Sequence, residues 1–409
     1  EDDGCAVARY RLYHYTEYVE KIEDIARLIA RDTVYSGDFD TYLDANFPAT
    51  GGQTQQVDEL FLSQINDWRV ALSNELYAKD GRFASLEVLN DVVQEFINQI
   101  VFLRICEDNN LPLYHKLKDT ITDDAQLQSK LEELFRFADR RYNSGMFSGE
   151  DIIFDLSCEV IKSMIEDLYY PQSPYLFNII EPNLLGKIYE MFLTEQLVLL
   201  ENNIIGLGKK KDCQNRSVVT TPTEIVKYMV DKTLSKVCQG KTPSEILNIH
   251  VADIACGSGI FLEEAFAFLQ DHCVQWYISN GQIDHLIETG IDLYKLPLQE
   301  KKDILCSCIY GIDIDIHAVE VAKFSLLIKL IEDETEPSVA EVVPILPDLS
   351  DNIQFGNSLI SQTELNGING ANHQIMEIAP FDWNTINNGC GFDVIIGNPP
   401  YVNTEGMHA

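Results

Sequence analysis

Three short apolar runs, separated by long helical stretches, constrain the fold of this chain more than any other feature. The runs cover Ile249–Ala255, Ile309–Ile314 and Phe392–Ile396, and each is rich in residues that favour strands. The stretches between them are long enough for the helical crossovers that join parallel strands. From about Val218 onward, the sequence therefore predicts an α/β fold with a doubly wound parallel sheet.

The part of the chain before this region has a helical pattern from Tyr10 to about residue 170. The pattern is clearest in a stripe of apolar residues at three- and four-residue steps, which is typical of a helix face in a core. The charged end of this helix, Phe102–Asp108, is expected to pair with neighbouring helices. In 409 residues we expect two domains, an all-α domain over 1–175 and the α/β domain over 176–409. The stripe consists of Leu89, Val92, Val93, Phe96, Ile97, Ile100 and Val101.

The charge is strongly acidic, with 30 basic and 65 acidic residues and a formal net charge of −35. A surface that binds nucleic acid attracts phosphates with positive charge, so the composition argues against such a ligand unless the charge is uneven. A local basic run, Gly208–Arg216, precedes the α/β region. Two interpretations of this run stay open, a phosphate contact and a solvated loop.

The cysteines give no metal-binding pattern. Of the ten, only Cys306 and Cys308 lie close together, without a second pair or a histidine cluster. We therefore predict reduced, buried thiols and no metal site. The sequence has no run of eighteen apolar residues and no secretion leader at its start, so we expect a cytoplasmic protein without membrane contact.

The first candidate binding motif is Val251–Leu262, an apolar run that leads through Gly257-Ser258-Gly259 into a helix. Glycines let a ligand approach the backbone, and amides at a helix start face a polar or anionic group. Nicotinamide and flavin enzymes also use such turns, but the full G-x-G-x-x-G pattern is absent here. A ligand without a pyrophosphate fits better.

The second motif is the end of the run Ile309–Ile314. Asp313 lies where an acid at the end of the second strand accepts hydrogen bonds from ribose hydroxyls. Asp315 is interpreted as the N-cap of the following helix. Asp313 follows Gly259 by 54 residues instead of the usual twenty or so, which predicts a long helical insertion between them.

The third motif is Phe392–Tyr401, an apolar run that ends in Asn398-Pro399-Pro400-Tyr401. Two prolines without amide hydrogens stop a strand and leave carbonyl oxygens at its end. The amino nitrogen of adenine is a poor nucleophile because its lone pair is delocalised into the ring. The side-chain oxygen of Asn398 and the main-chain oxygen of Pro399 are suited to accept its two hydrogens and localise that lone pair. Tyr401 would stack on a base flipped out of the duplex.

Together these motifs resemble the amino-methylating DNA adenine methyltransferases of the gamma motif order, most of all the methyltransferase regions of type IIG restriction-modification enzymes. The resemblance covers roughly residues 180 to 409 and includes Thr221-Pro222 and Gly356-Asn357-Ser358. The preceding helical stretch, with Leu89-Asn90 and Phe102–Asp108, resembles the connector domain of the type IIG group. The resemblance implies a Rossmann-like fold, S-adenosylmethionine as cofactor, and double-stranded DNA with a flipped-out adenine as substrate.

The resemblance also implies roles for single residues. Thr221 would contact the methionine end of the cofactor, and Thr221-Pro222-Thr223-Glu224 has the pattern of a capping box that starts a helix there. The family usually has an aromatic residue just before that threonine, where this chain has Thr220. Asn357 would face the adenine of the cofactor, at a position where the family often has an aspartate. The implied cofactor site is Thr221, Asp253, Ala255, Cys256, Gly257, Gly259, Asp313, Ile314, Asn357 and Ser358, and the implied catalytic site is Asn398, Pro399, Pro400 and Tyr401.

The ends of the sequence suggest a larger protein. The first residue is not methionine, and a sheet that stopped after the strand ending at Asn398 would leave an apolar edge exposed. We therefore expect later strands and a target-recognition domain beyond residue 409, and a nuclease or specificity region in the same or a partner chain.

Two other functions remain open. A methyltransferase acting on a glutamine side chain of a protein release factor also needs an amide nitrogen held by Asn-Pro-Pro-Tyr, and the acidic composition suits it. The 139 residues between Gly259 and Asn398 favour the DNA enzymes. The third possibility is a non-catalytic defence or DNA-mimic module that engages a protein through its negative charge; intact Asn398 and Tyr401 argue against it.

Overall fold

The structure, a computed structural model, describes residues 57–399 with internal gaps. Of two compact units, residues 1–63 and 64–409, the first is described only by residues 57–63, at the start of helix α4, so the following account concerns the second. Outside the described residues lie Pro400, Tyr401, most of the basic run and the stretch Pro182–Phe192, whose amphipathic pattern predicts a helix. The gaps are 80, 84, 114–115, 143–146, 148–151, 170–171, 174–194, 201–202, 210–220, 291–292 and 362–378.

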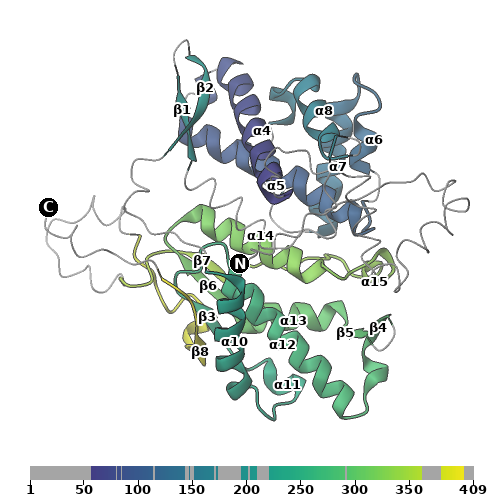
Figure 1. Cartoon of the computed structure of the whole chain (residues 1–409), viewed down its shortest axis with the longest axis vertical. Helices are drawn as coiled ribbons and strands as arrows, with labels where there is room; N and C mark the ends of the chain where they lie inside the picture. Colours follow the sequence, from purple (N-terminus) through teal and green to yellow (C-terminus); the bar gives the residue numbers. More distant parts are fainter. Residues whose placement is uncertain are drawn as a thin grey trace, which may run out of the picture. The chain divides into compact units, whose positions relative to one another are not determined.

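A four-stranded parallel sheet forms the centre of the α/β region (Figure 1). Its strands are β3 (Val251–Asp253), β6 (Ile309–Asp313), β7 (Ile353–Phe355) and β8 (Val394–Ile395), in the spatial order β7-β6-β3-β8. Each of the three apolar runs contributes one strand, as predicted. The third strand, β7, comes from a short run that was not predicted separately.

This strand order places a topological switch point between β3 and β8. Successive strands are added on one side of β3 up to β7, and the chain then returns to the other side to form β8. In open parallel sheets, ligands bind at the carboxyl ends of the strands where the order reverses. The ends of β3 and β8 carry the glycine turn and Asn398, so both motifs lie at this point.

Helices α12 (Ile260–Ser279) and α14 (Ile316–Ile331) are the crossovers that contact β6, and α10 (Thr223–Val237) and α13 (Leu298–Cys308) pack beside α12. Leu262 of α12 lies close to the backbone of β6. Because strand side chains alternate between faces, Ala252, Tyr310 and Ile312 point the other way. There they form a core cluster with Phe381 and Ile386, covered further by Trp383 and Phe392.

The 54 residues between Gly259 and Asp313 contain more than the predicted helical insertion. Between α12 and α13 the chain forms a 3₁₀ turn at Ile283–His285 and an antiparallel hairpin of β4 (Ile287–Gly290) and β5 (Leu293–Lys295). The stretch from Glu332 to Asp351 is largely irregular, as its composition predicts, with one short helix α15 (Glu336–Val339). Two further short elements are α11 (Pro243–Ile246) and a 3₁₀ turn at Asn387–Gly389.

The described residues before the sheet are mainly helical, and every residue of the predicted apolar stripe is buried in α5. The ion pairs at the charged end of α5 lie within the helix, because Arg104 pairs with Glu107 and Asp108, and the contact beyond the helix is its hydrogen bond to the Leu168 carbonyl at 3.1 Å. The elements are α4 (Val57–Lys79), α5 (Leu86–Asp108), α6 (Lys116–Thr120), α7 (Leu127–Tyr142) and α8 (Cys158–Glu166), with 3₁₀ turns at Gly81–Phe83 and Ile153–Asp155. None of the described helices is both long and apolar enough to span a bilayer.

A hairpin of β1 (Glu195–Leu199) and β2 (Ile205–Lys209) packs against the helical region. The Asn74 side chain of α4 donates to the Ile205 carbonyl at 2.8 Å and accepts from its amide at 2.7 Å. The helical region also contacts α14 directly. His317 Nε2 lies 3.5 Å from the Asp91 carboxylate, and the rings of Phe102 and Phe324 are 6.1 Å apart.

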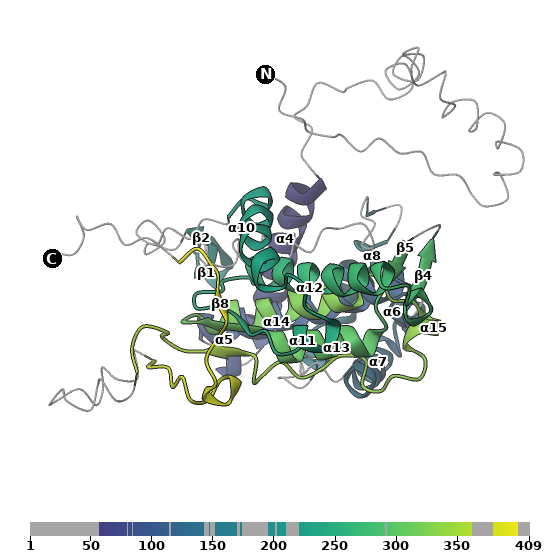
Figure 2. The same cartoon turned by 90° about the horizontal axis from the view of Figure 1, so that it is seen from below.

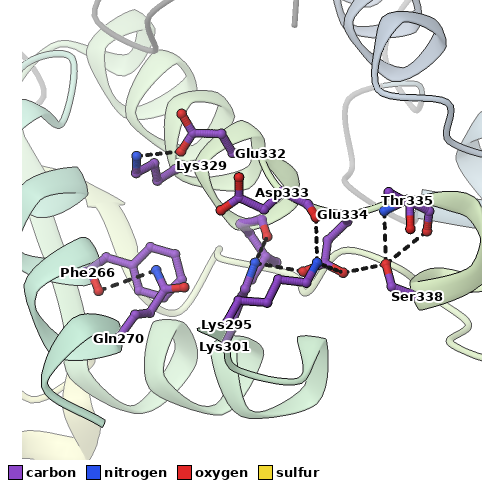
Figure 3. A network of polar contacts seen from close by, with 11 residues as sticks. Phe266, Gln270, Lys295, Lys301, Lys329, Glu332, Asp333, Glu334, Thr335 and Ser338 are labelled. Carbon is purple, nitrogen blue, oxygen red and sulfur yellow. Dashed lines mark hydrogen bonds and ion pairs between the residues drawn. The ribbon is translucent and has the colours of Figure 1, made fainter. Parts of the chain in front are cut away.

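A buried ionic network fixes the carboxyl end of α14 (Figure 3). The Glu334 side chain is fully buried and lies 2.7 Å from Lys301 Nζ and 3.0 Å from Lys295 Nζ. Burial alone would raise the pKa of Glu334, but the two lysines and the hydroxyl of Ser338 outweigh this effect and lower the pKa. The surplus positive charge faces the carbonyls of Leu330 and Asp333, where the helix dipole favours cations. Glu334 therefore holds both lysines at the end of α14, and the carbonyls offset part of the remaining positive charge.

Candidate active site

The glycine turn is held against the end of β6 by two backbone amides. The amide of Gly257 donates to Asp313 Oδ2 at 2.8 Å, and the amide of Cys256 donates to the Ile312 carbonyl at 3.0 Å. The Cys256 side chain is buried beside Gly311, so this residue offers its backbone to the turn. Two motifs 56 residues apart in sequence thus form one rigid unit.

Two glycines of this turn have different roles. Gly257 adopts a left-handed φ of +54°, and nothing lies within 4 Å of the position where its Cβ would be, so a ligand can approach the backbone there. Gly259 is the N-cap of α12 with φ of +91°, and its missing Cβ would lie 3.2 Å from the backbone of Ala322 in α14. Gly259 therefore serves helix packing, whereas Gly257 opens the site.

Asp313 organises the loop that follows β6. Its Oδ1 accepts from the amide of Asp315 at 2.9 Å, and Asp315 in turn caps α14 by accepting from the amide of His317 at 2.9 Å. The predicted N-cap at Asp315 is confirmed. The Asp313 carboxylate accepts the amides of Gly257 and Asp315, with a further backbone hydrogen bond from Ile314. Two carboxylate oxygens offer about four acceptor sites, so capacity remains for a ligand hydroxyl.

No cation among the described residues compensates the two acids at the ends of β3 and β6. Asp253 is 2% exposed, and burial, with a smaller contribution from the negative charge of Asp313, raises its pKa to about 7 in spite of the hydrogen bond from Ala255. Burial also raises the pKa of Asp313, although the amides of Asp315 and Gly257 oppose the shift. Perturbed acids in a crevice are typical of functional sites.

The side chains of Asn398 and Thr221 meet although 177 residues separate them. Asn398 Nδ2 donates to Thr221 Oγ1 at 3.1 Å, which fixes the direction of the amide. The predicted capping box is wrong. Helix α10 begins at Thr223 with Pro222 at its N-cap and no side-chain cap, because the Thr221 hydroxyl faces Asn398 instead of the helix amides.

Gly397, which follows β8, lies close to Asp253 at the end of β3. A Cβ at this position would lie 2.4 Å from Asp253 Oδ1 and 2.8 Å from its carboxyl carbon. Asp253 itself is fixed, because its Oδ1 accepts from the amide of Ala255 at 3.0 Å. Only glycine allows this approach. The motif analysis missed this contact, and the glycine directly before Asn398 was the available signal.

The segment after β7 also reaches the end of β3. The Ser358 hydroxyl donates to the Ile254 carbonyl at 2.7 Å, across 104 residues of sequence. The Asn357 side-chain oxygen accepts from the amide of Leu359 at 3.1 Å, so part of its acceptor capacity is used locally. Ile314 and Leu359 are 54% and 80% exposed, which leaves apolar surface next to these polar groups.

The described residues thus assemble most of the predicted site at one end of the sheet. Asn398 and Pro399 are exposed at the end of β8, while Pro400 and Tyr401 lie outside the described residues. Cys306 and Cys308 are free thiols, and no group of three possible metal ligands occurs among the described residues. The arrangement offers an open backbone turn, acceptors for hydroxyls, and an oriented amide at a strand end.

The comparisons with known proteins agree with this geometry. Residues 307–409 match the family model described as Eco57I restriction-modification methylase. The chain is 43% identical over 412 aligned residues to the type II restriction enzyme and methyltransferase RM.Eco57I of Escherichia coli, with 100% of the chain and 40% of that protein covered. RM.MjaORFECS2P of Methanocaldococcus jannaschii, named as a predicted enzyme of the same kind, is 24% identical over 354 residues, 73% of this chain and 28% of the relative.

The chain therefore spans less than half the length of the curated relatives that it matches. The family model covers β6, β7, β8 and the strand end at Asn398, and the identity to the Escherichia coli protein extends through the helical region. Residues 307–409 thus match the Eco57I restriction-modification methylase family model, and the whole chain is similar to part of a restriction enzyme and methyltransferase.

Proposed function

We propose that this chain is part of a restriction-modification enzyme and transfers a methyl group from S-adenosylmethionine to the amino nitrogen of an adenine in DNA. The observation that carries the proposal is the meeting of Asn398 and Thr221 at the switch point between β3 and β8. The contact of Gly397 with Asp253 supports the same arrangement. The strand order and the glycine turn fit a Rossmann-like methyltransferase fold.

The residues at the end of the sheet fit the proposed cofactor. Gly257 leaves open space beside the backbone, and Asp313 keeps acceptor capacity for a ribose hydroxyl. Ile314 provides an apolar surface beside the adenine position, and Asn357 and Ser358 follow the neighbouring strand. When bound, the cofactor supplies an electrophilic methyl group on a positively charged sulfur. Buried acids that have no counter-ion within the described part of the chain suit a cationic ligand.

The chain's own residues would activate and position the target nitrogen. The amide oxygen of Asn398 and the carbonyl of Pro399 each accept one amino hydrogen, so that the nitrogen lone pair points toward the donor. Thr221 holds the Asn398 amide in place, since its hydroxyl accepts from Nδ2. Positioning of this kind accounts for a large part of enzymatic rate enhancement. Tyr401 would stack on the flipped-out base, and Pro400 would keep the strand end rigid.

The proposal extends to the organisation of the protein. Residues 1–175 form a helical connector domain and residues 176–409 the first part of the catalytic domain, with nuclease and target-recognition regions in the same or a partner chain. The β1–β2 hairpin lies after this boundary yet packs on α4 and α5, which ties the two regions together. A DNA substrate assigns the protein to the cytoplasm.

The test uses labelled S-adenosylmethionine, unmethylated plasmid and the intact protein. Label should enter the DNA with the wild type and fall by at least about a hundredfold with Asn398→Ala, because the variant loses an interaction made in the transition state. Asn384→Ala is the matched control, because Asn384 is exposed and its Nδ2 donates to nearby Asp382. Label in protein instead of DNA would replace this proposal with a release-factor glutamine methyltransferase, which the acidic composition suits.

A further inference from the structure

Helix α10 is amphipathic, and its outer face is not covered by the described residues. Val226, Val230 and Leu234 are buried against α12. The opposite face carries a stripe of four residues at helical spacing, of which Ile225 is 50% and Tyr228 63% exposed. We call this set the α10 stripe. Its members are Ile225, Tyr228, Lys232 and Lys236.

The α10 stripe lies in the most basic part of an acidic chain. Residues 209–241 contain eight of the 30 basic residues and only three of the 65 acidic ones. The remainder of the chain is therefore even more acidic than its average. A polyanion would be repelled by most of this surface and attracted here. The basic residues are Lys209, Lys210, Lys211, Arg216, Lys227, Lys232, Lys236 and Lys241.

The stripe starts at the candidate active site. Ile225 follows Thr221 by four residues, and the Thr221 hydroxyl contacts Asn398, where the target base would be held. In both views α10 lies beside α12, the helix that begins at the glycine turn (Figure 2). From Ile225 to Lys236 the helix rises about 16 Å, at about 1.5 Å per residue. Over that length one strand of a duplex carries about five phosphates.

The local contacts leave the lysines able to bind phosphate. Lys232 Nζ lies 3.1 Å from the carboxylate of its neighbour Asp231, but both side chains are more than half exposed, and such pairs are weak. The ammonium also lies 5.5 Å from the centre of the Tyr228 ring, which holds it toward the stripe. Glu224 and Asp231 lie on one flank of the stripe and limit its width.

We propose that the α10 stripe binds the sugar–phosphate backbone of the DNA next to the flipped nucleotide. Lys232 and Lys236 contact phosphates, and Ile225 and Tyr228 pack on the sugars between them. The stripe thereby positions the duplex without reading its sequence. This inference rests on the proposed function and adds to it a location for the DNA-binding surface.

Lys232→Gln, Lys236→Gln and the double variant test this proposal in the intact protein, with a duplex containing the recognition site. Each lost phosphate contact should reduce the slope of log affinity against log salt by about 0.9, which corresponds to roughly eightfold weaker binding at 0.1 M salt. Lys227→Gln is the matched control, because Lys227 is also exposed but lies off the stripe on the same helix. Its affinity should change less than twofold.

Two further readouts separate the possible failures. Cofactor affinity, measured by calorimetry, should stay at the wild-type level in all variants, and methyl transfer at saturating DNA should do so in Lys227→Gln. If the double variant and Lys227→Gln showed the same slope of log DNA affinity against log salt, the inference would be overturned. The stripe would then be assigned to contact with a protein, while the proposed function would stand. If the wild type itself neither binds nor methylates DNA, the proposed function fails with it.

Discussion

Two segments of this protein have nearly the same sequence and different structures. Thr242-Pro243-Ser244-Glu245 forms a capping box, in which Thr242 accepts from the amide of Glu245 and the Glu245 carboxylate accepts from the amide of Thr242. Thr221-Pro222-Thr223-Glu224 has the same pattern, but its threonine does not cap α10 and instead accepts from Asn398. The difference shows that a tertiary partner can remove a residue from its local role.

The comparison separates a structural threonine from a functional one. Thr242 contributes to helix stability, and its effect is confined to the start of α11. Thr221 is buried beside the strand end and leaves the first amides of α10 without a side-chain cap. Residues at functional sites often break a local rule in this way. We therefore expect the two threonines to affect different measurements.

The largest effect is expected at Thr221. Thr221→Val keeps the shape of the side chain but removes the acceptor of the Asn398 amide, which is then free to turn. A misplacement of this size lowers methyl transfer by about a hundredfold, whereas thermal stability should stay within a few degrees of the wild type. Thr221→Ser, which keeps the hydroxyl, should restore most of the rate of transfer of labelled methyl groups to DNA. An equal loss in the valine and serine variants would contradict the assigned role.

A second effect is expected where Gly397 approaches Asp253. Gly397→Ala places a Cβ 2.4 Å from the Asp253 carboxylate, so the strand end must shift away from the glycine turn. Overpacking of this kind costs about 1–3 kcal/mol of unfolding free energy, and we expect at least tenfold slower methyl transfer. Gly290→Ala is the control, since its Cβ would make an ordinary contact at 3.4 Å. Urea unfolding and a methylation assay on both variants decide the matter.

A smaller effect is expected at Thr242. Thr242→Ala removes the cap of α11 and should lower the free energy of unfolding by about 1 kcal/mol. Methyl transfer should be unchanged at temperatures well below the unfolding midpoint. Should Thr242→Ala slow the reaction as strongly as Thr221→Val does, the separation of the two roles would be wrong.

The smallest effects concern pH. The folded-state pKa of Asp253 is raised to about 7 from 3.8, so the folded protein binds a proton that the unfolded chain has released, and stability falls as pH rises from about 4 to 7. The pKa of Glu245 is lowered by its hydrogen bonds to Thr242, so its contribution is present above pH 4.5 and is lost as pH falls. Unfolding curves of Asp253→Asn and Glu245→Gln should therefore differ from the wild type with opposite slopes, for Asp253 between about pH 4 and 7 and for Glu245 below about pH 4.5.

The sequence predicts those parts of the fold that depend on local pattern. The buried stripe of α5, the three apolar runs and the N-cap at Asp315 follow from residue spacing alone, and the structure contains all of them. The strand β7 has only three residues, and the β4–β5 hairpin interrupts a helical stretch. Neither gives a period long enough to recognise.

The site was predicted as a set of residues, but not as a set of contacts. The bond from Ser358 to the Ile254 carbonyl and the approach of Gly397 to Asp253 join segments more than 100 residues apart. Such contacts depend on strand order, which no local pattern determines. The start of α10 was predicted wrongly for the same reason. The Thr221 hydroxyl accepts a hydrogen bond from Asn398, which is distant in sequence, and does not cap the helix.

The most direct test of the account is nucleoside mass spectrometry of plasmid DNA after incubation with the protein and S-adenosylmethionine. The account predicts N6-methyladenine with the wild type, and none above background with an Asn398→Ala variant that still binds the cofactor by calorimetry. Two results would contradict the claim that methyl transfer to adenine takes place at the strand end that carries Asn398. The first is the absence of methylated adenine with a folded wild type that binds the cofactor, and the second is an equal amount of methylated adenine from the two proteins.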